Sequence, residues 1–158
     1  LIKSAENYFF QSEQIKTFFD LNITKKHGEK NGKNWSASGF MLQALPEDND
    51  TSKNNIYGYH YDLHDYKFMN LFVYLNDVDE DSGPHTYIKT SVHDKSLYKS
   101  IRRRLSHKNI HNRYPNKEAV LTGKKGTAFL EDTYGYHRGT LPKKYRVILQ
   151  CEYKLYKH

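Results

Sequence analysis

The feature that most constrains the fold is a succession of short apolar stretches separated by turn residues. Many short strands, with no regular alternation of strands and helices, favour an antiparallel sandwich or barrel. We therefore expect an all-β core with flanking helices. Helices are predicted at residues 4–20 and 95–105, where apolar residues recur at helical spacing. The predicted strands are residues 38–45, 56–63, 68–75, 86–90, 119–122, 127–130 and 145–153, with a hairpin-like turn at residues 123–126.

The length of 158 residues predicts a single domain, residues 1–158. The chain starts at Leu1 rather than Met, so we expect it to be truncated at the N-terminus. Only 37% of the residues are hydrophobic, but 14 tyrosines can bury apolar rings while their hydroxyls stay polar. We expect no membrane span and no signal peptide. The single cysteine, Cys151, excludes an internal disulfide and favours a reducing compartment, for which we expect the cytoplasm.

A basic segment, residues 94–117, carries the net charge. It holds eight Lys or Arg residues and one acid, which gives 8 − 1 = +7, equal to the charge of the whole chain. One interpretation is a solvated insertion. Another is a lid that presents Arg102, Arg103, Arg104 and Lys108 to an anionic small-molecule substrate. A nucleic-acid surface is less favoured, because the segment lacks interleaved exposed aromatic residues.

Metal-ligating residues occur as an H-x-D pair, His60 and Asp62. Residues i and i+2 of a strand point to the same face, so these two side chains project together. The best third ligand is His137, just before the last strand; His64 and His85 are next in line. Two imidazoles and a carboxylate leave open positions on an octahedral Fe(II), where a co-substrate and dioxygen bind in non-haem iron oxygenases.

Arg146 lies nine residues after His137, at the start of an otherwise aliphatic strand. Burying a guanidinium is costly without an anionic partner, and its planar fork matches a carboxylate. The C5 carboxylate of 2-oxoglutarate is the natural partner. An ordinary ion pair with Glu131 or Glu152 is the alternative.

From about residue 57 onward, the chain resembles the phytanoyl-CoA dioxygenase family of Fe(II)/2-oxoglutarate-dependent oxygenases. The resemblance rests on residues 60–64, 75–84 and 126–130, followed by His137 and Arg146. Residues 90–93 depart from the family pattern, which has Gly-Ser-His at this corner. The resemblance implies a double-stranded β-helix, or jelly roll, in which the acidic residues 77–81 form a solvated turn rather than a calcium site.

The resemblance also implies the roles of the site residues. His60, Asp62 and His137 would bind Fe(II), and Arg146 would bind 2-oxoglutarate. Phe72 would line the cofactor pocket, and the Thr140 hydroxyl would contact the same carboxylate as Arg146.

The expected activity is hydroxylation of a small molecule with O2 as the oxidant, because the related halogenases have a small residue in place of Asp62. Two alternatives stay open. One is a non-catalytic jelly-roll metal-binding module. The other is a cupin-like metalloenzyme that does not use 2-oxoglutarate.

Overall fold

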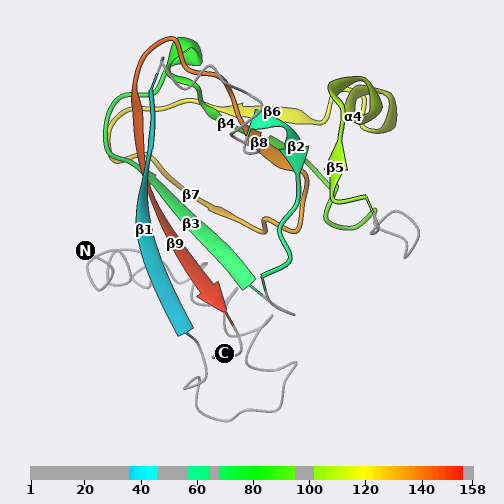
Figure 1. Cartoon of the computed structure of the whole chain (residues 1–158), viewed down its shortest axis with the longest axis horizontal. Helices are drawn as coiled ribbons and strands as arrows, with labels where there is room; N and C mark the ends of the chain where they lie inside the picture. The colour runs from blue at the N-terminus through cyan, green and yellow to red at the C-terminus, as the bar shows by residue number, and fades with distance from the viewer. Residues whose placement is uncertain (1–35, 46–56, 65–67, 95–101, 155–158) are drawn as a thin grey trace.

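The computed structural model describes residues 36–45, 57–64, 68–94 and 102–154, which form two antiparallel sheets (Figure 1). The four-stranded sheet has the order β1 (Ser36–Ala44), β9 (Arg146–Lys154), β3 (Phe68–Tyr74) and β7 (Ala128–Glu131). The five-stranded sheet has the order β5 (Arg104–Leu105), β2 (Tyr59–His60), β8 (His137–Gly139), β4 (His85–Ile88) and β6 (Glu118–Leu121). The described helices include the 3-10 helix η3 (Glu80–Ser82) and α4 (His107–Arg113).

Strand β9 organises the four-stranded sheet, because it pairs with β1 on one side and with β3 on the other. Its side chains alternate between the two faces of the sheet. Leu149, Cys151 and Tyr153 pack with Leu71 in one hydrophobic cluster. Arg146, Ile148 and Gln150 point the other way and line a cavity. The polar residues of this strand therefore sit at the positions that face the cavity.

A cluster of tyrosines forms a second core beneath α4. Tyr59, Tyr61, Tyr114 and Tyr136 are buried there, and Ile110 of α4 packs against them. Ser106 caps the N-terminus of the helix, since its Oγ accepts a hydrogen bond from the Asn109 backbone N–H at 3.3 Å. Because tyrosine supplies so much apolar area, a chain with few aliphatic residues still has a closed core.

Two predicted elements near the basic segment and the 123–126 turn differ from the structure. The helix predicted at residues 95–105 is wrong at Arg104 and Leu105, which form β5; α4 begins only at His107, after its cap. Residues 95–101 and the helix predicted at 4–20 lie outside the described residues. The hairpin predicted around residues 123–126 is also wrong, because β6 and β7 belong to different sheets and the chain crosses between them there.

The strand predicted at 56–63 is much shorter in the structure. After His60 the backbone leaves the β2–β8 pairing, and the Asp62 N–H donates to the Thr133 carbonyl at 2.8 Å. Strand β4 starts at His85 and ends at Ile88, before Thr90 turns the chain at a φ of 68°. In the part of the chain that the structure describes, no helix has the length and apolar character that a membrane span requires.

Candidate functional site

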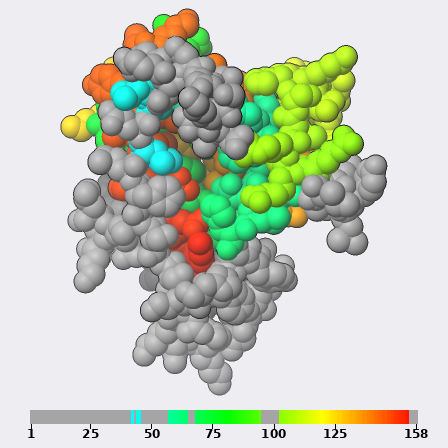
Figure 2. All heavy atoms as spheres, viewed as in Figure 1, coloured from blue at the N-terminus to red at the C-terminus, as the bar shows by residue number. Residues whose placement is uncertain are grey.

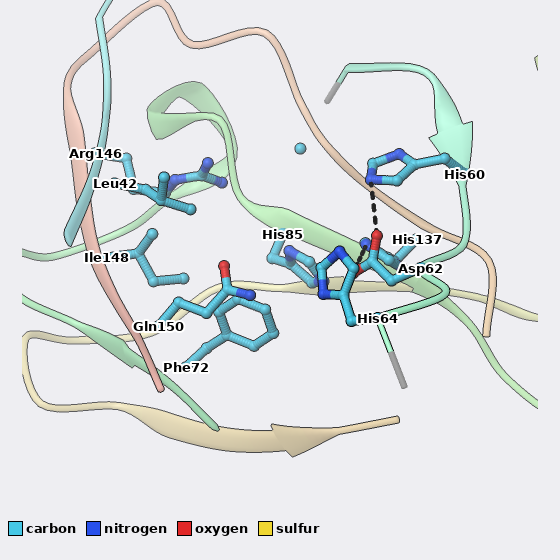
Figure 3. Close-up of a pocket in the computed structure, with 11 residues that line it drawn as sticks. Leu42, His60, Asp62, His64, Phe72, His85, His137, Arg146, Ile148 and Gln150 are labelled. Carbon is cyan, nitrogen blue, oxygen red and sulfur yellow. Dashed lines mark ion pairs between the residues drawn. The ribbon is translucent and has the colours of Figure 1, made fainter. Parts of the chain in front are cut away.

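Three potential metal ligands converge at one end of the five-stranded sheet. His60 on β2 and His137 on β8 are cross-strand partners, and their ring centroids lie 4.4 Å apart. Asp62 follows β2 and approaches both rings: His60 Nε2 lies 4.0 Å from Asp62 Oδ1, and His137 Nε2 lies 3.7 Å from Asp62 Oδ2 (Figure 3). One ligand atom from each residue lies within 4.8 Å of the other two. The structure thus brings these three predicted residues together.

Both imidazoles are oriented in the same way. The Nδ1 of His60 lies 2.8 Å from the Gly58 carbonyl, and that of His137 lies 3.0 Å from the Gly135 carbonyl. A proton on each Nδ1 satisfies that carbonyl and leaves Nε2 as a lone-pair donor facing Asp62. Burial lowers the pKa of His60, and it lowers the pKa of His137 to about 4. Both rings are therefore neutral near pH 7, as metal binding requires.

This arrangement fits a first-row divalent metal. Adjacent ligands of an octahedral ion bound at about 2.1 Å lie about 3 Å apart, so small side-chain rotations from the observed separations suffice. Two neutral imidazoles and one carboxylate are a donor set that Fe(II) accepts, and three ligands on one side leave positions open on the other. The chemistry of the residues therefore matches the metal expected from the sequence.

The open side of this group faces a cavity of about 250 Å³ between the two sheets (Figure 3). The four-stranded sheet contributes the apolar side chains of Phe72 and Ile148 and the polar side chains of Arg146 and Gln150. The cavity is lined by Leu42, His60, Asp62, His64, Phe72, His85, His137, Gly139, Arg146, Ile148 and Gln150. Phe72 thus lies in the wall of this cavity.

Arg146 is 4% exposed, and its guanidinium lies in the same cavity. Its Nη1 donates to the Gly83 carbonyl, while its Nε has no hydrogen-bond partner among the described residues. Burial lowers the pKa of this guanidinium. The described part of the chain contains no ion pair between Arg146 and Glu131 or Glu152, because these acids pair with other residues. The ordinary ion pair considered as an alternative is thus not observed there.

The Ser-Gly-Pro turn holds Arg146 in place. Gly83 has a φ of 71°, and a Cβ there would lie 2.6 Å from the Thr140 carbonyl oxygen. Glycine is thus required for the close packing of this turn. The Thr140 hydroxyl donates to the Pro84 carbonyl at 2.5 Å, and Thr140 does not line the cavity. Of the predicted site residues, the structure therefore leaves only Thr140 outside the cavity, where its hydroxyl ties the last loop to the turn.

A buried acid and imidazole lie behind the metal-ligand group. His85 Nε2 is 2.7 Å from Glu131 Oε2, and Glu131 Oε1 is 3.7 Å from His137 Nδ1. The His85 ring stacks on that of His137, with centroids 5.5 Å apart and planes at 22°. Burial raises the pKa of Glu131 to about 8 and lowers that of His85 to about 3, so the proton resides on Glu131 at neutral pH. This neutral pair supports the wall of the cavity.

One polar network at the cavity was not predicted from the sequence. Gln150 Nε2 donates to Asn70 Oδ1 at 2.9 Å, and Asn70 Nδ2 donates to Thr133 Oγ1 at 2.7 Å. The sequence signal for this network is that Asn70 and Gln150 interrupt otherwise apolar strands at positions that face inward. His64 also lines the cavity, and its Nδ1 contacts Glu152. These contacts fix the Gln150 amide and the His64 ring at the cavity surface.

The acidic run at residues 77–81 is a different kind of charge cluster. Each aspartate of this turn pairs with a lysine from a neighbouring loop, and all these groups are largely exposed. The pairs are Asp77–Lys124 at 2.9 Å, Asp79–Lys144 at 2.6 Å and Asp81–Lys143 at 2.9 Å. These ion pairs therefore connect the turn to the loops at residues 122–127 and 140–145.

A comparison with protein-family models gives a match to the Hsp33 protein family over residues 1–108. The chain belongs to the Hsp33 protein family. The assignment to the phytanoyl-CoA dioxygenase family is therefore wrong. The pieces that carried it agree with the jelly-roll architecture, which unrelated families share. The matched residues include His60 and Asp62 and end before His137 and Arg146. No curated protein matches the sequence.

Solved structures match the fold. The epimerase SnoN from nogalamycin biosynthesis, described as non-heme and alpha-ketoglutarate dependent, superposes with a TM-score of 0.54 at 12% identity over 91% of this chain and 59% of its own. AviO1 from Streptomyces viridochromogenes superposes with a TM-score of 0.51 at 14% identity, covering 75% of this chain and 50% of its own. HygX from Streptomyces hygroscopicus, with nickel and 2-oxoglutarate bound, superposes with a TM-score of 0.50 at 14% identity, covering 87% of this chain and 63% of its own.

These likenesses confirm the predicted all-β jelly-roll fold. The chain spans about half to two thirds of the length of these structures. At such identities the shared feature is the fold, and the chemistry has to be argued from the residues of this chain.

Proposed function

We propose that this chain is an Fe(II)- and 2-oxoglutarate-dependent oxygenase acting on a small molecule. The observation that carries the proposal is that His60, Asp62 and His137 share one cavity with a buried Arg146. Fe(II) and 2-oxoglutarate together supply the O2-dependent oxidation of a C–H bond, with succinate and carbon dioxide as the other products. The matched structures include one with nickel and 2-oxoglutarate bound, which supports this choice of metal and co-substrate.

The residues of the chain divide the task between the two sheets. His60, Asp62 and His137 would hold the metal, with both imidazoles presented through Nε2. Arg146 would bind the distal carboxylate of 2-oxoglutarate, because a buried guanidinium with a free Nε gains most from a charged acceptor. Phe72 and Ile148 would pack against the methylene groups between the two ends and keep water out. These contacts would position the co-substrate with one end at the metal.

The direct test measures the formation of succinate. Purified protein with Fe(II), 2-oxoglutarate and O2 should form succinate above the rate of a matched His60→Ala/Asp62→Ala variant. Many such enzymes turn over slowly without the primary substrate, so a screen of carboxylated and neutral small molecules should reveal compounds that raise this rate. A wild-type protein that binds Fe(II) and 2-oxoglutarate but forms no succinate with any compound would instead be a non-catalytic binding module.

The family match does not bring a second function to this site. Hsp33 is a redox-regulated chaperone family, and redox regulation acts through accessible thiols. Residues 1–108 contain no cysteine, and Cys151 is buried. An enzyme that uses the metal without 2-oxoglutarate is the remaining alternative. It would bind the metal equally well and would leave Arg146 without a role in ligand affinity.

A further inference from the structure

The basic segment places an arginine directly beside the metal-ligand group. β5 is the edge strand of the five-stranded sheet, and Arg104 is the cross-strand partner of His60. Directly opposed residues of an antiparallel pair project from the same face. Because the His60 ring lines the cavity, the Arg104 side chain starts on the cavity side of the sheet. Arg103 starts on the opposite side, since successive residues alternate.

The backbone around Arg104 is firmly attached to the sheet. The Tyr61 N–H donates to the Arg103 carbonyl at 3.2 Å, and the Tyr136 hydroxyl donates to the Arg102 carbonyl at 3.1 Å. Leu105 packs against the buried tyrosine cluster. The interpretation of the whole basic segment as a solvated insertion therefore does not fit residues 102–105.

This edge of the sheet carries exposed positive charge beside residues that line the cavity. Arg102, Arg103 and Arg104 are all exposed. Figure 2 shows the residues around 102–113, in yellow-green, directly beside the residues around 57–64, in teal, on one face of the molecule. Arg104 is the residue of this edge that lies directly opposite His60 in the strand pairing.

We propose that Arg104 forms a subsite for a negatively charged group, a carboxylate or a phosphate, on the small molecule that enters the cavity. Arg146 would bind the co-substrate deep inside, and Arg104 would bind the second anion at the rim, next to His60. This inference adds a substrate class to the proposed oxygenase, and the binding itself requires neither metal nor turnover. A guanidinium is suited to both anions because its donors match two acceptor oxygens at once.

The test is a binding titration of the metal-free, ¹⁵N-labelled protein at constant ionic strength. The probes are phenyl phosphate and benzoate, with benzyl alcohol as the neutral control, and backbone amide shifts of Tyr59, His60 and Leu105 are followed by NMR. We expect at least one anion to give saturable shifts and benzyl alcohol to give none. The stronger of the two anions identifies the preferred group. Equal shifts with the alcohol, or no saturable shift with either anion, would overturn the proposal.

Matched variants separate the subsite from the general charge of the edge. Arg104→Gln should lower the affinity for the anion at least fivefold. Arg103→Gln removes the same charge on the other face and should change this affinity less than twofold. Arg104→Lys keeps the charge but loses the paired donors of the guanidinium, so its affinity for the anion should lie between those of the wild type and Arg104→Gln. Equal losses in Arg103→Gln and Arg104→Gln would show a diffuse electrostatic effect and would overturn the proposed subsite. Because the assay contains no iron, 2-oxoglutarate or O2, its failure is distinguishable from failure of the proposed activity.

Discussion

The two sheets contribute different chemistry to one cavity. The five-stranded sheet supplies short strands, and its strand ends and loops carry the imidazoles of His60 and His137 beside the Asp62 carboxylate. The four-stranded sheet supplies the long strand β9, which carries Arg146, Ile148 and Gln150 at alternating positions. In the proposed function, the five-stranded sheet would hold the metal and the four-stranded sheet would bind the co-substrate next to it. Substitutions on each sheet should therefore have separate effects.

The largest effect is expected on the five-stranded side. His137→Ala removes one of the three proposed ligands and should weaken Fe(II) binding by at least about 100-fold, since even residues that only support a ligand affect affinity by about 10–100-fold. Anaerobic titration with Fe(II) measures this change. His111→Ala removes an exposed histidine of α4 and is the matched control. Similar Fe(II) affinities in the two variants would contradict the assignment of His137 as a metal ligand.

The next effect belongs to the four-stranded side. Arg146→Gln should weaken 2-oxoglutarate binding by about 10–100-fold, because a charge-assisted hydrogen bond contributes about 1.5–3 kcal/mol. Fe(II) affinity should change little, since Arg146 does not belong to the ligand group. Isothermal titration of the Fe(II)-loaded protein under anaerobic conditions gives both values. A parallel loss of metal binding would mean that the two sheets do not act separately.

An intermediate effect is expected from Glu131, which comes from the four-stranded sheet and contacts histidines of the other. Burial raises its pKa in the folded protein to about 8, well above the usual value of a glutamate, so its contribution to stability is present at low pH and is lost as the pH rises toward 8. Glu131→Gln should therefore flatten the fall in Tm of the metal-free protein between pH 5 and pH 8. An unchanged pH profile would show that Glu131 is not a neutral acid in the folded protein.

The smallest effect is expected at the acidic turn, outside the cavity. Hydrogen bonds from Lys144 and Ser82 lower the pKa of Asp79 to about 2. Its contribution to stability is therefore present above pH 4 and is lost as the pH falls through 2. Asp79→Asn should lower Tm slightly at pH 7, and the difference from wild type should vanish near pH 2. A loss of metal binding in this variant would contradict the assignment of residues 77–81 as a structural turn.

The sequence predicted the long strands, because strands β1, β3 and β9 appear as apolar runs. The H-x-D spacing also predicted that His60 and Asp62 lie together, as the structure shows. The short strand β8 has no apolar pattern, and the separation of β6 from β7 depends on which sheet each joins. The contact between the Thr140 hydroxyl and the Pro84 carbonyl was not predictable for a similar reason, since it is set by the packing of distant loops. The family was also misassigned, because a shared jelly-roll pattern does not identify a family.

The central claim is that both sheets build a single Fe(II)- and 2-oxoglutarate-binding site. Anaerobic addition of Fe(II) and then 2-oxoglutarate, followed by visible absorption, tests it most directly, because chelation of the 2-oxo acid to bound Fe(II) gives a charge-transfer band. We expect a band that saturates at one equivalent of each, that is lost in His137→Ala, and that requires more 2-oxoglutarate in Arg146→Gln. Absence of the band in the wild-type protein, or its persistence in His137→Ala, would show that the two sheets do not build such a site.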